Sequence, residues 1–231
     1  MRYIHALKTG LFLAVVCLCA HGQNPPSPPS PSGKDAQANE ARGVPPRAAP
    51  ADYQAHAVVG TVTVAAEFLG HSVPRPEGSP LTNEDYVVVE TAFFGPPDAH
   101  LKLSAGDFSL RVNEKKVASP GQPFGVVFKS LKDPDWEDAN AVDTKSKSST
   151  GISTGGRGGQ SNDPPAPVHM PLALQRVINQ YVQRVSMPEG ERALPQAGMI
   201  FFPHRGKVEN IHSLELTYAG PAGTVTMMLQ P

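Results

Sequence analysis

Cysteine is nearly absent from this chain of 231 residues, which has only Cys17 and Cys19. Both lie near the N-terminus, so the rest of the chain has no thiol for a disulfide bond, a zinc site or an iron–sulfur cluster. Charge is also sparse, at 18% charged residues and a formal net charge of −1. This balance excludes a strongly basic nucleic-acid binder and an acidic solvating chain. The sequence has no G-x-G-x-x-G, P-loop or H-E-x-x-H pattern, so no local motif supports nucleotide binding or a zinc protease.

The N-terminus has the organisation of a secretory signal peptide. Arg2 and Lys8 precede an apolar stretch at 10–20. This stretch is shorter than the ~20 apolar residues that a bilayer-spanning helix needs. Small residues at Ala20 and Gly22 form a cleavage pattern, which predicts a signal peptide at 1–22. We therefore expect an exported protein, periplasmic or extracellular in a bacterial envelope, with no membrane span after the signal is removed.

Two stretches have the composition of disordered chain. Residues 23–52 begin with a Pro-Ser tract and continue with alanine, proline and charged residues, and residues at about 139–167 centre on a Gly/Ser run. Neither stretch can bury enough apolar surface to offset the entropy of ordering it. The sequence thus predicts a Pro-rich tether at 23–52 and a β-sandwich domain at 53–231, interrupted by a disordered Gly/Ser insertion at about 139–167.

Most of the remaining chain alternates apolar and polar residues, as half-buried strands do. The exception is 85–94, whose nearly continuous apolar run is typical of a central strand. The segments with a strand pattern are 58–68, 85–94, 107–113, 124–128, 199–202, 214–218 and 225–229. Short strands separated by turn residues predict a mainly β fold, an antiparallel sandwich.

One amphipathic helix is predicted at 171–186. Its apolar residues recur at helical spacing, and its other face is polar. The stripe consists of Leu174, Val177, Ile178, Tyr181, Val182 and Val185. We expect it to pack over one end of the sandwich.

Four segments carry a family resemblance: 86–90, 107–112, 197–206 and 211–223. They contain a Tyr-Val-Val-Val strand, an Asp-Phe-Ser-Leu strand, a Gly-Met-Ile-Phe-Phe strand and a closing hairpin. Together they resemble uncharacterised exported proteins of the acidobacterial type, with an immunoglobulin-like β-sandwich domain of unknown function. The resemblance implies export and an immunoglobulin-like antiparallel sandwich, here with one inserted amphipathic helix and two disordered segments. The shared motifs concern packing, so no catalytic residue is implied.

An acidic run around the only tryptophan is the most distinctive polar cluster. Asp133, Asp135 and Glu137 alternate as oxygen ligands do at the start of a calcium loop. The run departs from such a loop at Asp138, where glycine is usual, and it lacks the closing acid. A solvated acidic turn is the alternative interpretation. Trp136 is a candidate anchor for a sugar or protein partner, or a residue packed over the edge of the core.

No catalytic constellation is visible in the sequence. The G-x-S-x-G match at 151–155 lacks the strand and helix that a nucleophile elbow requires, and no two histidines after residue 22 stand at metal-binding spacing. We therefore expect a non-catalytic exported envelope protein, a binding or structural module on a flexible tether. Its partner would be an envelope glycan or protein, and its only cofactor would be the hypothetical calcium ion. The alternative is an exported hydrolase with a dispersed active site.

Overall fold

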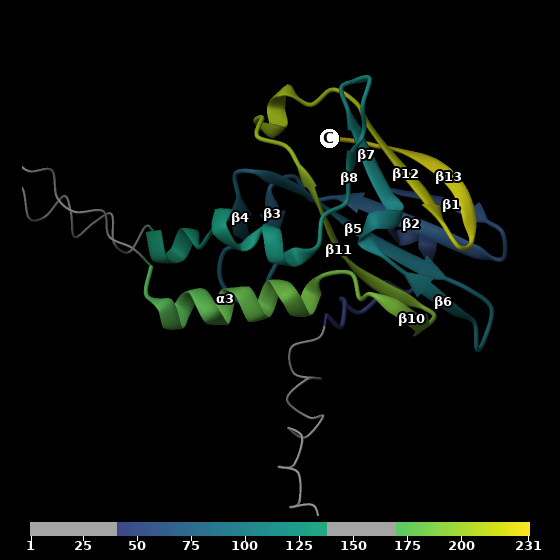
Figure 1. The fold of residues 1–231 in the computed structure, drawn as a ribbon, viewed down its shortest axis with the longest axis horizontal. Coiled ribbons are helices and arrows are strands. Elements are labelled where there is room, and N and C mark those ends of the chain that lie inside the picture. Colours follow the sequence, from purple (N-terminus) through teal and green to yellow (C-terminus); the bar gives the residue numbers. More distant parts are fainter. Residues whose placement is uncertain (1–40, 138–169) are drawn as a thin grey trace, which may run out of the picture.

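The computed structural model describes residues 41–137 and 170–231. The predicted signal peptide, residues 23–40 of the predicted tether and the predicted Gly/Ser insertion lie outside the described residues. The described chain is mainly β, and α3 (Leu172–Val185) is its one long helix (Figure 1). Among these residues, no helix is both long and apolar enough to cross a membrane.

Two four-stranded antiparallel sheets form the sandwich (Figure 1). The first sheet has the order β1-β2-β5-β11, and the second has the order β13-β12-β7-β8. The strands of the first sheet are β1 (Ala55–Val59), β2 (Val62–Phe68), β5 (Tyr86–Phe94) and β11 (Gln196–Pro203). Those of the second sheet are β13 (Gly223–Leu229), β12 (Leu214–Gly220), β7 (Phe108–Val112) and β8 (Ser119–Pro120). Each sheet contains strands from both described segments, residues 41–137 and residues 170–231, so the two segments pack as one unit.

Smaller elements complete the fold. Two further small sheets have the orders β10-β6 and β3-β4-β9. Their strands are β3 (Ser72–Val73), β4 (Leu81–Asn83), β6 (His100–Leu103), β9 (Leu131–Lys132) and β10 (Gly190–Ala193). The short 3-10 turns are η1 (Pro50–Asp52), η2 (Ala105–Asp107), η3 (Phe124–Val126), η4 (Phe128–Ser130) and η5 (Val208–Asn210).

The predicted central strand is β5, and both of its faces are buried. Val87 and Val89 point into the space between the two sheets, whereas Val88 points to the outer face of the first sheet. On the neighbouring strand, Phe202 faces inward and Phe201 outward. A strand that is covered on both faces needs a continuous apolar run, which explains why this segment does not alternate.

Helix α3 covers the outer face of the first sheet rather than one end of the sandwich. Ile178, Val182 and Val185 are buried in one cluster with Val88 and Phe201. The sheet therefore lies between the helix and the second sheet, which gives the molecule three layers.

The expectation for Val177 was wrong, because this side chain is 61% exposed. Successive residues turn by about 100° around a helix. Val177 therefore lies about 100° from Ile178, beyond Tyr181 at the rim of the buried face.

Two predicted strands also differ. The segment 58–68 is a hairpin, because Gly60 adopts a left-handed φ of 58° and reverses the chain between β1 and β2. The segment 124–128 forms η3 and η4 instead of a strand, and the rings of Phe124 and Phe128 lie 5.6 Å apart. A short apolar run has no period that distinguishes a strand from a turn of helix.

The expected tether boundary at residue 52 was wrong, because residues 41–53 pack on the first sheet as an N-terminal strap. The backbone N–H of Val44 donates to the carbonyl of Ala197 on the edge strand β11, at 2.9 Å. Further along, Tyr53 is buried against small side chains, including Ala65 and Ala92. The guanidinium of Arg47 lies 4.5 Å from the centre of the Tyr53 ring. The strap has so few large apolar residues that its composition matched that of a tether.

Candidate functional site

The predicted acidic cluster forms an ion-pair network with Arg75. The guanidinium donates to both carboxylate oxygens of Asp133, at 3.0 and 2.8 Å, and to Asp135 at 2.6 Å. The backbone N–H of Ser79 also donates to Asp135, and hydrogen bonding from Ser79 lowers the pKa of that carboxyl. The guanidinium thus takes the place that the calcium hypothesis assigned to the cation. Residues 41–137 and 170–231 contain no group of three or more histidine, cysteine or acidic side chains placed to hold a metal.

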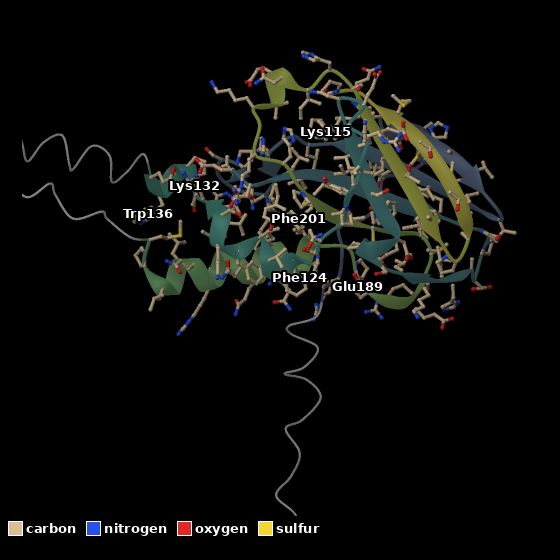
Figure 2. All side chains as sticks on the ribbon, turned by 45° about the horizontal axis from the view of Figure 1, so that its top comes forward. Lys115, Phe124, Lys132, Trp136, Glu189 and Phe201 are labelled. Atoms are coloured by element: carbon tan, nitrogen blue, oxygen red, sulfur yellow. The ribbon has the colours of Figure 1, made fainter. Side chains whose placement is uncertain are left out.

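The other two predicted site residues lie at the edge of the described chain. Glu137 is exposed, and Trp136 is half-buried with its backbone N–H bonded to the carbonyl of Asp133, at 3.2 Å. Figure 2 shows Trp136 far from Lys115, at the end of the molecule where the chain leaves the described part. A role for Trp136 in binding a sugar or protein stays a prediction.

A polar groove lies at the opposite end of β5 from the strap residue Tyr53. It consists of two adjoining hollows of about 580 and 540 Å³. Both are lined by Asp85, Arg205 and Gly206, so the loop that follows β11 separates them. We define the polar groove by the histidine and charged residues of its lining, which are His71, Glu84, Asp85, Lys115, His204, Arg205 and Lys207.

One wall of the groove is shaped by a buried asparagine. Asn83 is fully buried at the end of β4, and its side-chain oxygen accepts from the backbone N–H groups of Asp85 and Tyr86, both at 3.0 Å. Its side-chain nitrogen donates to the carbonyl of Val127 at 3.3 Å. An asparagine that bonds to its own following backbone fixes a tight turn. This turn holds Glu84 and Asp85 at the rim of the groove.

A second part of the lining is held by His71, whose carbonyl accepts from the backbone N–H of Asn83 at 2.9 Å. Its Nδ1 lies 2.8 Å from the carbonyl oxygen of Tyr86, and its Nε2 lies 2.8 Å from the carbonyl oxygen of Gly206. A histidine with two N–H groups satisfies both carbonyls, whereas the neutral ring donates to only one. The His71 ring also stacks on His204 with 6.0 Å between ring centres. His71 therefore ties the loop after β11 to the start of β5.

His204 packs tightly inside this arrangement. Its backbone N–H donates to the carbonyl of Asp85 at 2.8 Å. A Cβ atom at Gly206 would lie 2.7 Å from Nε2 of His204, so a side chain at this position would require the ring to shift. Burial lowers the pKa of His204, and the charges of His71 and Lys115 lower it further. Both effects disfavour the protonated form of the ring.

Cations outnumber carboxylates in the groove. Nε of Arg205 donates to Asp85 at 2.8 Å, and Glu84 pairs with Lys132 outside the lining. Lys115 and Lys207 are exposed and form no ion pair with any described residue. Such a surface can bind an anionic group, while its carboxylates can accept hydrogen bonds from hydroxyl groups.

Neither a family model, nor a curated protein, nor a solved structure matched this chain.

Sequence reasoning missed the polar groove. His71 and His204 have no informative spacing, yet the fold brings their rings together from opposite parts of the chain. The only local signal was the Thr-Asn-Glu-Asp run at 82–85, in which an asparagine before two acids is typical of a turn. No sequence pattern linked that turn to Arg205.

Proposed function

We propose that this protein is a non-catalytic exported envelope protein, in which the β-sandwich binds an envelope glycan or protein through the polar groove. The Pro-rich sequence at 23–40 would act as the tether. Loops on a rigid sandwich are common binding surfaces, because the sheets hold the loops in place and do not themselves contact the ligand.

The observation that carries the proposal is the placement of the groove relative to the start of the described chain. Arg42 and Gly43 both donate backbone N–H groups to the carbonyl of Arg184, at the C-terminal end of α3. Figure 1 shows that end of α3 on the opposite side of the molecule from η5, which follows the groove loop directly. A domain tethered through its strap would therefore present the polar groove away from its attachment.

The sequence resemblance supports the same proposal. Uncharacterised exported proteins with immunoglobulin-like domains are the group that segments 86–90 and 197–206 resemble. The signal-peptide pattern at 1–22 supports export to the periplasm or the cell exterior.

Export is tested by N-terminal sequencing and intact mass of the protein from a bacterial host. We expect the mature chain to start at Gln23 in the periplasmic or extracellular fraction. A start at Cys17 or Cys19 with the added mass of a lipid, or a full-length cytoplasmic product, would contradict this.

Binding is tested by co-sedimentation with purified envelope fragments. We expect the double variant Arg205→Glu/Lys207→Glu to lose retention, because both side chains are exposed groove cations. Lys102→Glu is a control with half the charge change, since Lys102 is an exposed cation on β6, outside the groove lining. Equal retention of the wild type and the double variant would show that the groove is not the binding surface.

The observation that would favour the alternative hypothesis, an exported hydrolase, is the stacked pair of His71 and His204 in the groove that Asp85 also lines. Histidine and carboxylate side chains in one polar groove are common catalytic groups. This hypothesis predicts that bound envelope polymer is cleaved and that His204→Gln stops the cleavage. The binding hypothesis predicts that bound polymer is recovered intact.

A further inference from the structure

We infer that the ligand of the polar groove is a carboxylate-bearing glycan, such as a saccharide chain with uronic acid units. The inference rests on the proposed function and names the class of its ligand. It follows from the number, the spacing and the rigidity of the charged groups in the groove.

Three cations line the groove and are available to a ligand. The Arg205 side chain is 84% exposed, and its ion pair with Asp85 uses Nε. A guanidinium has five N–H donors in a fixed plane, which match the two oxygens of a carboxylate. Lys115 lines one hollow and Lys207 lines the other, with Arg205 between them. Anionic groups spaced along one chain could therefore meet a cation in each hollow.

The backbone of Arg205 stands on an ordered frame. His204 is held by its backbone bond to Asp85, and Gly206 is held by His71, so the residue between them is anchored on both sides. A ligand that binds a preformed loop loses less free energy in ordering it. A groove built in this way can discriminate between ligands by shape as well as by charge.

The acidic side chains decide the class of anion. Glu84 and Asp85 line the groove together with the three cations, and their side chains are 70% and 40% exposed. A dense polyanion such as polyphosphate would place phosphate charges against these carboxylates as well as against the cations. A glycan that carries one carboxylate per sugar can place its hydroxyl donors on them.

The groove also has ring surfaces. Tyr86, Pro203 and His204 line the hollow that contains Lys115. The C–H face of a sugar can pack on the apolar faces of such rings. This feature favours a saccharide over a simple inorganic anion.

The test measures binding of the full chain to three soluble polymers by calorimetry: polygalacturonate, neutral dextran and polyphosphate. We expect polygalacturonate to bind tightest and to weaken as NaCl rises from about 50 to 300 mM, because salt screens exposed charge pairs. Arg205→Glu/Lys207→Glu should weaken polygalacturonate at least tenfold, and Lys102→Glu should change it less than twofold. Circular dichroism melts establish that each variant is folded.

Four results would overturn the inference: no binding of polygalacturonate, equal binding of dextran, tighter binding of polyphosphate, or binding of polygalacturonate that the double variant leaves intact. The proposed function has its own outcome. Suppose that the double variant Arg205→Glu/Lys207→Glu no longer binds envelope fragments, and that the wild type does not bind polygalacturonate. The ligand class is then wrong, and the groove remains a binding surface. If the double variant retains envelope fragments as well as the wild type does, the proposed function fails too.

Discussion

Replacing Ile178 with alanine should destabilise the whole domain, whereas the same change at the adjacent Val177 should not. Ile178 is 5% exposed and packs with Val88 and Phe201 beneath α3. Val177 is 61% exposed on the same helix. The two positions share their helix and their apolar character, so they differ mainly in whether the side chain contacts the first sheet. Alanine is the best helix former, so neither change weakens the helix itself.

The size of the effect follows from burial. Truncating a buried isoleucine to alanine costs about 2–5 kcal/mol, because the transfer free energy is lost and a cavity remains. We expect about 3 kcal/mol for Ile178→Ala, a large part of the ~5–15 kcal/mol that stabilises a typical domain. For a domain of this size each kcal/mol lowers Tm by about 2–4 °C, so Tm should fall by about 6–12 °C. Val177→Ala should stay within about 0.5 kcal/mol, as is usual for exposed positions.

Urea denaturation provides the assay, with two probes of different parts of the molecule. Far-ultraviolet circular dichroism reports on the secondary structure of the whole domain, and fluorescence reports on Trp136, the only tryptophan. Because both sheets contain strands from either side of residues 138–169, the two probes should give coincident transitions that shift together.

The reasoning would be refuted if Val177→Ala cost as much as Ile178→Ala. A decrease of less than about 1 kcal/mol in the free energy of unfolding of Ile178→Ala would also refute it, since truncating a buried isoleucine should destabilise the domain by more than that. A shift of the fluorescence transition alone would show that the segment around Trp136 and the sheets do not unfold together.

Three further outcomes are expected. Arg47→Ala should lower stability by about 1 kcal/mol in urea denaturation, because the strap loses ion pairs to Glu67 and Glu90 that are only partly buried; an unchanged midpoint would contradict the docking of the strap. Burial holds the pKa of His204 below its ordinary 6.5, so the unfolded chain binds the proton more tightly and stability is lost as pH falls through this value. His204→Gln should reduce the loss of stability between about pH 7.5 and 5.5, and an equal loss in both proteins would count against this assignment. Burial raises the pKa of Asp107, and the negative charge of Glu189 raises it further. The folded chain therefore gains stability as this carboxyl takes up a proton in acid. Asp107→Asn should therefore raise Tm at pH 7 and lose that advantage near pH 3; a lower Tm at pH 7 would argue against the assignment.

The sequence by itself determined the fold class and most of the larger elements. Alternation predicted β7, β12 and β13, and a continuous apolar run predicted the doubly covered β5. The 3.6-residue period predicted α3 with nearly correct bounds. These predictions succeed because each period is set by neighbouring residues and by the burial of one or two faces.

The tertiary structure alone decided the strap, the acidic network and the polar groove. Val44 is part of the domain because it bonds to Ala197, and Asp133 is an ion-pair partner because Arg75 reaches it. His71 meets His204 only when the loop after β11 returns to the start of β5. Each of these contacts joins residues that are distant in the chain. The spacing of residues along the sequence has no information about such contacts. They depend on which strands are neighbours in each sheet and on how the layers pack together.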